Sequence, residues 1–497
     1  MTSPTPLKLF NSLTRQLEPF QPVHANEARV YSCWPTVYNY QHIGNMRAYV
    51  FADTLGRVLR FKGYDLRHII NITDVGHLTS DADAGDDKME KAAALSGKTA
   101  WDIAAFYTGE FKRDLKWLNV TDPAKWTVAT DYVPTMIEYA KSIADKHCYE
   151  LDSGLYFDVS TVPDYGRLAR AATEDGEGRI DEVGGKRHQA DFAIWRKTPA
   201  GETRQMEWDS PWGRGAPGWH LECSVMSAAE LGMPFDIHTG GIDHREIHHP
   251  NEIAQNQAHE CSAHTGANIW MHNNFLIDRG GKMSKSAGEF LRLQTLVDRG
   301  YHPLAYRMMC LQAHYRSELE FSWEGLSAAL VRLKRMVMAV SQLVERTDRS
   351  VTSRLRDGFT QKVIEDCESA FSSDLATPKA LAAFELLALQ GYPKFAPIVE
   401  NDEAAKQGIC NARLDAVEEL DQVFGLGLLT LTRADLRIRP KSATITEPEI
   451  EAILAQRKEA RAAKDFATSD RLRDQLTAQG VEVMDGDPLG WDWKLGT

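Results

Sequence analysis

The chain has 497 residues, of which 43% are hydrophobic, so it is too long for one core and too apolar for a disordered protein. Its formal net charge of −13 argues against a protein whose whole surface is basic and binds nucleic acid, so any basic binding faces must be local. No run of about 18 apolar residues occurs, and the N-terminus lacks the profile of a secretory signal. We expect a soluble, cytoplasmic protein of about three or four domains.

Seven cysteines are scattered along the chain without close pairing. An odd, scattered set in a large chain argues against a disulfide framework. A cysteine taken at random is most simply a small buried hydrophobe, so any cysteines with a special role are expected to be metal ligands.

The first 75 residues predict one parallel βαβ unit of a Rossmann-type, doubly wound α/β sheet. Residues 28–33 have the pattern of a short buried strand. Residues 45–62 have the pattern of a long helix closed by Gly63, and residues 66–72 that of a second strand. In such a sheet, ligands bind at the carboxyl ends of the strands.

The pattern becomes less regular between residues 121 and 215, which predicts an insertion between two halves of the sheet. Strand-like runs resume at residues 234–241 and 270–277. Apolar residues at i, i+3 and i+4 then predict a helical bundle, and a polar stretch near Pro440 predicts a linker. The expected units are the α/β domain in two halves (residues 1–120 and 216–324), the insertion (121–215), the bundle (325–440) and a small C-terminal domain (441–497).

The loop between the first strand and its helix carries His42, Gly44 and Asn45. Backbone N–H groups at a helix N-terminus bind anions, and a glycine there lets a ligand approach closely. The imidazole of His42 could donate to phosphate oxygens as charge builds on them. Taken alone, however, this histidine is more simply one that satisfies a turn.

A second motif, Gly280-Gly-Lys282-Met-Ser-Lys285-Ser286, follows a predicted strand. Its two ammonium groups and two hydroxyls suit a polyphosphate whose charge is being redistributed. An ordinary solvated basic loop is the alternative for this motif alone.

Together, the two motifs resemble the HIGH and KMSKS signatures of class I aminoacyl-tRNA synthetases. Within that class, the segments 33–38, 217–224 and 248–255 are similar to the metal-bearing stretches of the cysteinyl enzymes. The resemblance implies ATP with Mg²⁺, L-cysteine and tRNA(Cys) as partners, no membrane, and one zinc ion per chain. By matching positions, the zinc ligands would be Cys33, Cys223, His248 and Glu252.

These four residues also make sense by their chemistry. Two thiolates, an imidazole and a carboxylate suit zinc, and His248 and Glu252 stand at i and i+4 near a helix start. Coordination would lower the pKa of an incoming cysteine thiol, so that its thiolate binds the metal while serine is rejected. A purely structural zinc is the alternative, because four protein ligands ordinarily close a site.

Other site residues are assigned by position. The resemblance implies that Trp219 walls the cysteine pocket, although a core tryptophan is the alternative. His238 and Thr73 lie at strand ends that face the same crevice, His238 toward the adenylate and Thr73, beside Asp74, toward the substrate. The histidines at 244, 249, 259 and 264 receive no role and are expected at the surface or around the ligands.

Three residues depart from the family pattern. Asn45 stands at the second histidine of the HIGH signature, which keeps a donor and removes a titratable group. Trp34 stands where glycine is common beside the first zinc ligand, so the sequence leaves the backbone there open. Pro250 lies between His248 and Glu252, which is tolerable only in the first turn of a helix.

The tail carries basic residues on a predicted helix: Arg457, Lys458, Arg461 and Lys464. A solvated face is the usual interpretation of this spacing. The resemblance implies instead that the bundle and the C-terminal unit meet the tRNA, with the anticodon read by the small unit. Trp491 and Trp493 are candidates for stacking on its bases.

The expected reaction has two steps. Cysteine and ATP give cysteinyl-adenylate and pyrophosphate, and a terminal ribose hydroxyl of the tRNA then takes the cysteinyl group. The side chains expected to stabilise the moving charge are His42, Asn45, Lys282 and Lys285. We expect a monomer, although nothing in the sequence fixes the oligomeric state.

Two alternatives stay open. A cysteine ligase that joins cysteine to an amino sugar in thiol biosynthesis resembles the same core, but would not need the bundle or the C-terminal unit. A catalytically silent tRNA-binding paralogue should have lost its phosphate-handling residues, and the intact segment from Lys282 to Ser286 argues against it.

Overall fold

The computed structural model describes residues 5–75, 88–169, 184–278, 281–282, 291–352, 356–390, 402–487 and 489–495. Within these ranges, no helix combines the length and the hydropathy that a membrane span requires. The seven cysteines are all described, and none forms a disulfide.

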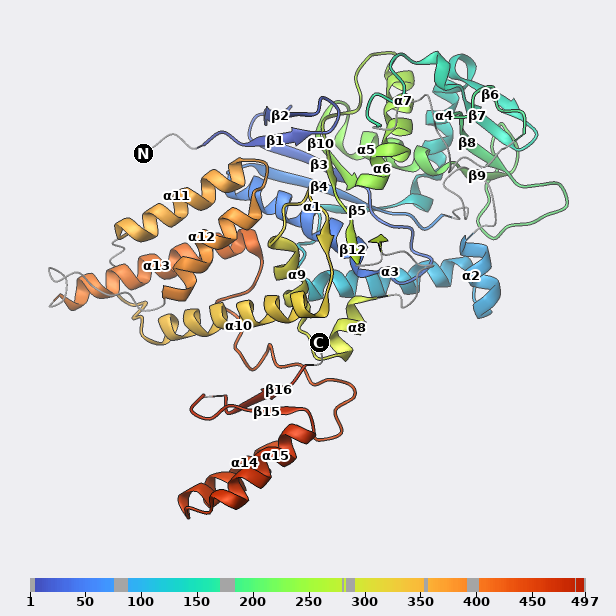
Figure 1. Ribbon diagram of the computed structural model, residues 1–497. Coiled ribbons are helices and arrows are strands. Elements are labelled where there is room, and N and C mark those ends of the chain that lie inside the picture. The colour runs from blue at the N-terminus through green and yellow to red at the C-terminus, as the bar shows by residue number, and fades with distance from the viewer. Residues whose placement is uncertain are drawn as a thin grey trace.

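A five-stranded sheet with the order β11-β10-β3-β4-β5 lies at the centre of the molecule, and every neighbouring pair is parallel (Figure 1). Its strands are β3 (Glu27–Ser32), β4 (Asp65–Ile72), β5 (Lys125–Val128), β10 (Phe235–Gly241) and β11 (Ala267–Asn273). The strand order reverses between β3 and β10, so ligands are expected at the carboxyl ends of these two strands. The predicted doubly wound sheet is confirmed.

Helix α1 (Ile43–Phe61) follows β3, as the sequence predicts, and its apolar side packs against the sheet. The side chain of His42 caps its first turn, and Gly63 at φ 88° lets the chain turn back into β4. A hairpin of β1 (Lys8–Asn11) and β2 (Gln16–Pro19) precedes the sheet.

The single strand predicted at residues 270–277 is wrong, because two strands stand there. Strand β11 ends at Asn273, and β12 (Leu276–Asp278) joins a small sheet with β13 (Gly281–Lys282) and β14 (Leu319–Glu320). The chain leaves the main sheet here because it pairs with a segment far away in sequence: the N–H of Asn274 donates to the carbonyl of Tyr315, and the carbonyl of Phe275 accepts from the N–H of Leu319. The buried guanidinium of Arg47 also donates to the carbonyls of Asn274 and Phe275.

The predicted insertion begins later than residue 121, because β5 lies inside that segment and pairs with β4 as the edge of the main sheet. After the short helix η1 (Ala129–Tyr132), the insertion itself is helix α4 (Val133–His147) followed by an antiparallel sheet. Its strands are β6 (Cys148–Leu151), β7 (Gly154–Phe157), β8 (Phe192–Lys197) and β9 (Gly215–Pro217), with η2 (Val159–Thr161) after β7. In Figure 1 this unit lies at the end of the sheet away from the bundle.

The remaining helices of the α/β domain surround the sheet. They are α2 (Lys88–Ser96), α3 (Ala100–Trp117), α5 (Trp219–Leu231), α6 (Ile242–Glu246), α7 (His248–Glu260), α8 (Leu293–Asp298) and α9 (Pro303–Leu311).

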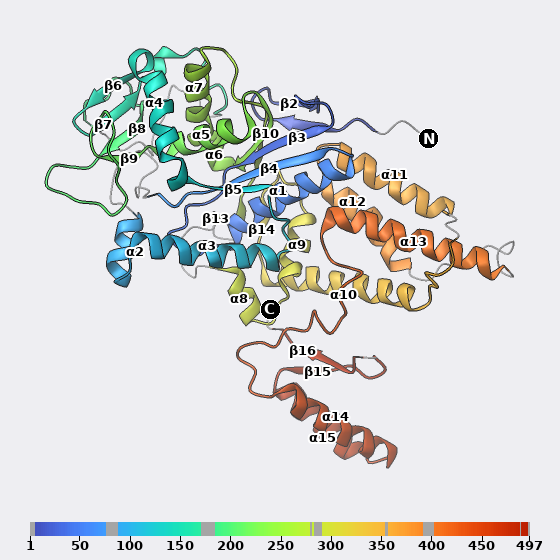
Figure 2. The same cartoon turned by 180° about the vertical axis from the view of Figure 1, so that it is seen from behind.

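The predicted helical bundle is present. It consists of α10 (Trp323–Glu345), α11 (Gly358–Ser372), α12 (Thr377–Gln390) and α13 (Glu403–Phe424). Its buried apolar residues, among them Leu333 and Phe424, form one continuous core with Leu55 of α1. Figure 2, seen from behind, shows α13 and α12 lying against this end of the α/β domain. The bundle is therefore fixed to the sheet by shared hydrophobic packing.

The C-terminal unit has a small core of its own, formed by α14 (Glu447–Ala462), α15 (Phe466–Ala478), β15 (Val481–Val483) and β16 (Trp491–Trp493). Trp491 and Trp493 fill this core, with exposed fractions of 0% and 4%, so the prediction that they stack on bases is wrong. Arg457 is also buried, since its guanidinium is paired with both carboxylate oxygens of Asp485. A small domain cannot form a core without its largest apolar side chains.

Candidate metal centre and active-site crevice

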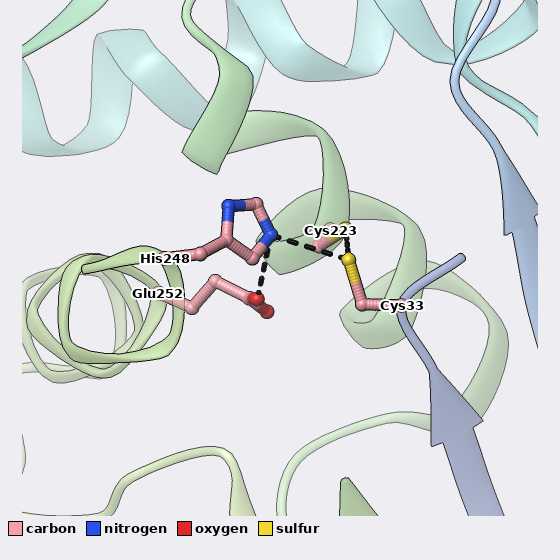
Figure 3. Close-up of side chains that lie close together, drawn as sticks. All are labelled: Cys33, Cys223, His248 and Glu252. Atoms are coloured by element: carbon pink, nitrogen blue, oxygen red, sulfur yellow. Dashed lines mark hydrogen bonds and ion pairs between the residues drawn. The ribbon is translucent and has the colours of Figure 1, made fainter. Parts of the chain in front are cut away.

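Two thiols, an imidazole and a carboxylate meet at the carboxyl end of the sheet (Figure 3). Cys33 directly follows β3, and its N–H donates to the carbonyl of Thr239 in the neighbouring strand β10. Cys223 comes from α5, and His248 and Glu252 come from the first residues of α7. The ligand atoms of all four residues lie within 4.8 Å of one another, and all four side chains are buried. The structure thus brings together the four residues that the sequence selected.

The spacing of these atoms fits a tetrahedral metal ion. The Sγ atoms of Cys33 and Cys223 are 3.3 Å apart, and Sγ of Cys33 lies 3.4 Å from Nε2 of His248. Nε2 of His248 is 3.1 Å from Oε1 of Glu252. Tetrahedral zinc with its usual bond lengths would hold such atoms roughly 3.3–3.8 Å apart. These three distances each lie within about half an ångström of that range.

The carboxylate of Glu252 shows the need for a cation most directly. Its Oε2 is hydrogen-bonded to Nε2 of His238 at 2.9 Å, and its fully buried Oε1 faces Nε2 of His248 at 3.1 Å, although no well-aligned hydrogen bond from the described residues reaches it. Burial alone would raise the pKa of Glu252, yet the attraction of His238 and His248 holds it at about 2. An anionic oxygen in a dry site is costly unless a cation or donor neutralises it. The donor set therefore fits a metal ion.

Without an ion, the thiols prefer to keep their protons. Burial raises the pKa of Cys223 well above its ordinary value, and the nearby thiol of Cys33 adds to this effect. A bound cation reverses this preference, because it stabilises the thiolate.

Two further histidines, His220 and His238, form hydrogen bonds with the ligands and fix their orientation. Nδ1 of His220 and Nδ1 of His248 share a hydrogen bond of 2.9 Å, which leaves Nε2 of His248 directed at the thiols. His238 holds Glu252, and its ring stacks on Trp270. Its predicted contact with the adenylate stays a prediction, since the ring lies buried against Glu252. The sequence interpretation missed His220, although it stands only three residues before Cys223.

The sequence also gave no role to His249, which is fully buried beside the cluster. Its Nδ1 shares a hydrogen bond of 2.8 Å with Nε2 of His272, and its Nε2 lies 3.9 Å from Oε1 of Glu252. Burial lowers the pKa of His249 well below its ordinary value, so the ring is neutral. A neutral, buried imidazole fits the expected place around the ligands.

The departures from the family pattern are accommodated. Pro250 is the third residue of α7 and therefore lies in its first turn, where no intrahelical N–H is needed. The backbone N–H of Trp34 donates to Oδ1 of Asn71 at 2.6 Å, and its ring packs against Tyr49. The tryptophan thus anchors the segment that carries Cys33.

Trp219 and Thr73 border the cluster. Trp219 begins α5, and its half-buried ring lies 4.3 Å from the ring of His248, measured between centroids. The hydroxyl of Thr73 donates to Oε2 of Glu222 at 3.0 Å. Burial raises the pKa of Glu222 to about 8. Asp74 is turned elsewhere, because its carboxylate accepts from the N–H and the hydroxyl of Thr130.

The first phosphate motif lies at the start of α1. Nδ1 of His42 accepts a hydrogen bond of 3.3 Å from the N–H of Asn45, so this histidine does satisfy a turn in the structure. A Cβ on Gly44 would lie 2.8 Å from the His42 ring, so a larger residue here would force that ring to move. The N–H of Ile43 donates to the carbonyl of Leu291, which follows the second motif closely. Leu291 therefore lies at this helix start.

The second motif is described only in part. Lys282 belongs to β13, whose backbone pairs with β12, while Lys285 lies outside the described residues.

Comparison with known proteins agrees with this geometry. Residues 19–331 match the model of the class I (C) tRNA synthetase catalytic domain, and residues 446–488 match the cysteinyl-tRNA ligase anticodon binding domain. The fold is similar to that of methionyl-tRNA synthetase from Mycobacterium tuberculosis in complex with methionyl-adenylate. The TM-score is 0.54 at 15% identity, over 81% of this chain and 91% of that chain.

The sequence has much closer relatives. A cysteine–tRNA ligase of Novosphingobium aromaticivorans is 67% identical, over 99% of this chain and 97% of the relative. A cysteine–tRNA ligase of Zymomonas mobilis is 52% identical, over 98% of both chains. The chain belongs to the cysteinyl-tRNA synthetase family.

Proposed function

We propose that the protein activates L-cysteine with ATP, in the presence of Mg²⁺, and transfers the cysteinyl group to the 3′-terminal ribose of tRNA(Cys). The observation that carries this proposal is the buried cluster of Cys33, Cys223, His248 and Glu252 at the switch point of the sheet. The match of the C-terminal unit to an anticodon binding domain favours a tRNA substrate over the amino sugar of the alternative ligase.

We propose that the cluster holds one zinc ion. When bound, zinc would lower the pKa of the substrate thiol and accept its thiolate. A serine hydroxyl resists deprotonation and is a poorer zinc ligand, so serine would be rejected. Glu252 is the ligand expected to loosen, because His238 already holds its other oxygen. The half-buried ring of Trp219 beside His248 would form one wall of the cysteine pocket, and Thr73 would border it.

The phosphates of ATP would lie at the start of α1. His42, Gly44 and Asn45 present an imidazole, a close-approach glycine and a donor at this helix N-terminus. Lys282 and Lys285 would stabilise the charge that moves onto pyrophosphate, and Lys285→Ala is expected to slow adenylate formation by about 100-fold. Normal single-turnover activation in that variant would remove Lys285 from the mechanism.

The decisive experiment is cysteine-dependent exchange of pyrophosphate into ATP, followed by charging of purified tRNA(Cys). We expect exchange with cysteine and none with serine at equal concentration. Exchange that does not depend on an amino acid, or exchange without any charging, would contradict the proposal.

A truncation tests where the tRNA is recognised. The C-terminal unit has its own core, so a chain that ends near residue 440 should keep its active site and its exchange activity. Charging should fall steeply, because the unit carries exposed Lys458 and Lys464, and single lost phosphate or base contacts are worth roughly 1–3 kcal/mol. Equal charging by both proteins would show that the unit does not read the tRNA. Thermal melting of both proteins at one stated salt concentration is the control.

A further inference from the structure

A buried tyrosine in β3, Tyr31, lies next to the four candidate metal ligands. It stands two residues before Cys33, and side chains at i and i+2 of a strand point to the same face of a sheet. Its exposed fraction is 0%, and its ring belongs to the hydrophobic core that also contains Cys33 and Cys223. Tyr31 therefore lies on the same side of the sheet as these two thiols.

The neighbouring strand β10 fixes the position of the Tyr31 ring. Tyr31 pairs with His238 in the parallel register of β3 and β10, and the two rings meet edge to face with their centroids 5.2 Å apart. The ring of His238 also stacks on Trp270, with centroids 4.5 Å apart. Rings in a packed layer of this kind have little freedom to tilt, so the tyrosine hydroxyl is held in one place.

The hydroxyl of Tyr31 makes no well-aligned hydrogen bond with any described residue. A buried hydroxyl without an acceptor costs free energy, and a phenylalanine would fill the same space without that cost. Burial raises the pKa of Tyr31 well above its ordinary value, and three of the candidate ligands add to this effect: Cys223, Cys33 and Glu252. The hydroxyl therefore keeps its proton, and the acceptors that lie near it are metal ligands.

A change at Cys223 would supply the missing acceptor. A thiol accepts hydrogen bonds only weakly, whereas a thiolate accepts them strongly because its charge attracts the donor. Cys223 must give up its proton to bind a metal ion. A hydrogen bond to the resulting thiolate draws charge away from the sulfur, so the sulfur donates less charge to the ion. The ion then attracts the substrate thiol more strongly.

We propose that Tyr31 is a positioning residue that donates a hydrogen bond to the thiolate of Cys223 and thereby keeps the metal ion electron-poor enough to bind the substrate thiolate. This inference rests on the proposed function, because it requires a metal ion in the cluster.

The test replaces zinc with Co²⁺ in the full-length protein, because the absorption band for charge transfer from sulfur to cobalt reports the charge on the thiolates. Tyr31→Phe removes the hydroxyl and keeps the ring. The band should move to longer wavelength, since a sulfur without its hydrogen bond gives up an electron more readily. Zinc affinity, measured by competition with a chelator, should fall roughly tenfold or more, as is usual when a partner of a metal ligand is lost. The Michaelis constant for cysteine should rise severalfold, while that for ATP stays the same.

Tyr139→Phe is the matched control. Tyr139 is also buried in this core, but its hydroxyl already donates to Oδ1 of Asn256 at 3.2 Å. The control should leave the cobalt band and the zinc affinity unchanged. Thermal melting of the metal-free proteins should show the opposite order. Tyr139→Phe should melt at a lower temperature than the unsubstituted protein and Tyr31→Phe should not, because only Tyr139 has a hydrogen bond to lose in the absence of metal.

An unmoved cobalt band in Tyr31→Phe would overturn the inference. A loss of melting temperature in metal-free Tyr31→Phe as large as that in Tyr139→Phe would also overturn it, because the hydroxyl would then have an acceptor without any metal. Failure of the unsubstituted protein to give a cobalt band would contradict the proposed metal centre itself. A band that is present but identical in the two proteins removes only the role of Tyr31.

Discussion

Two buried clusters of charged groups, one at the carboxyl end of β3 and one on α1, are built differently. In the first, Cys33, Cys223, His248 and Glu252 converge on one another, and one carboxylate oxygen accepts no hydrogen bond from the described residues. In the second, which we call the Asp53 network, the guanidinium groups of Arg57 and Arg307 are matched by acceptors.

The Asp53 network joins helices α1 and α9 of the α/β domain to the bundle. Arg307 donates to Oδ2 of Asp53 at 2.6 Å, to the carbonyl of Phe424 at the end of α13, and to the carbonyl of Leu118. Arg57 donates to the same carboxylate. Burial by itself would raise the pKa of Asp53, yet Arg307 and Arg57 keep it below its ordinary value. Gly425, at φ 65°, packs directly against the Arg307 guanidinium, where a Cβ would not fit.

The difference separates a structural cluster from a binding cluster. A buried network whose donors all end on acceptors specifies how two units dock. A buried set of ligand atoms that face each other, with one carboxylate oxygen left without a well-aligned hydrogen bond, is incomplete until a cation arrives. The four predictions below test this distinction.

The largest effect is expected from Arg307→Met. Removing one partner leaves the Asp53 carboxylate buried with one cation fewer, so the free energy of unfolding should fall by about 3–5 kcal/mol. Zinc content should stay unchanged. Urea denaturation and metal analysis measure the two quantities. Lys362→Met is the control, because its pair with Asp366 is exposed to solvent and contributes little to stability. Equal losses in the two variants would show that the network has no special role in docking.

Cys223→Ser should show the reverse pattern. It removes a zinc ligand, so metal affinity should fall by at least about 100-fold, while the fold of the metal-free protein changes little. The Michaelis constant for cysteine should rise far more than that for ATP. Metal analysis with pyrophosphate exchange measures both. Active unsubstituted protein without zinc would disprove the selectivity mechanism.

His220→Phe tests the histidine that orients His248. Loss of the shared hydrogen bond should lower zinc affinity roughly 10–100-fold while the aromatic volume is kept. Competition with a chelator measures this affinity. His259→Phe, at the far end of α7, is the matched control and should bind zinc normally. Unchanged zinc affinity in both variants would mean that His220 is not needed to orient His248.

The smallest effect concerns His68, whose ring lines a cavity together with Trp34 and Asp53 between the two clusters. Burial lowers the pKa of His68 from 6.5 to about 4. The unfolded chain therefore binds a proton between these values that the folded chain does not, and stability falls as the pH falls through this window.

Between pH 6.5 and pH 5.5, this group should remove about 1 kcal/mol from the free energy of unfolding. Urea titrations of the unsubstituted protein and of His68→Gln should differ in slope with pH by that amount. Parallel pH profiles would show that the ring is not held neutral.

Local pattern and residue chemistry were enough to predict much of the molecule. The periodicity of residues 28–72 predicted β3, α1 and β4, and the later helical spacing predicted the bundle. The ligand set could be chosen because few residue types bind zinc, and because the family resemblance fixed their positions.

The errors share one cause, which is that the deciding partner lies far away in sequence. The strand predicted at 270–277 is divided where residues 274 and 275 bond to Arg47 and to the segment 315–319. Strand β5 pairs with β4 and so belongs to the main sheet. Arg457 was predicted to lie on the face that meets the tRNA, but its guanidinium is paired with Asp485. Trp491 and Trp493 are conspicuous as stacking candidates, but the small C-terminal unit needs both for its core.

The sequence by itself determined which side chains could bind zinc and phosphate, because those properties belong to the residue types and their local spacing. Only the tertiary structure decided how they are held. His220 and His238 reach His248 and Glu252 from other elements. Arg307 binds Asp53, which lies 254 positions away, and also the end of α13 in the bundle. Hydrogen-bond partners of buried groups depend on which distant segments pack together, and that choice is made by the whole core.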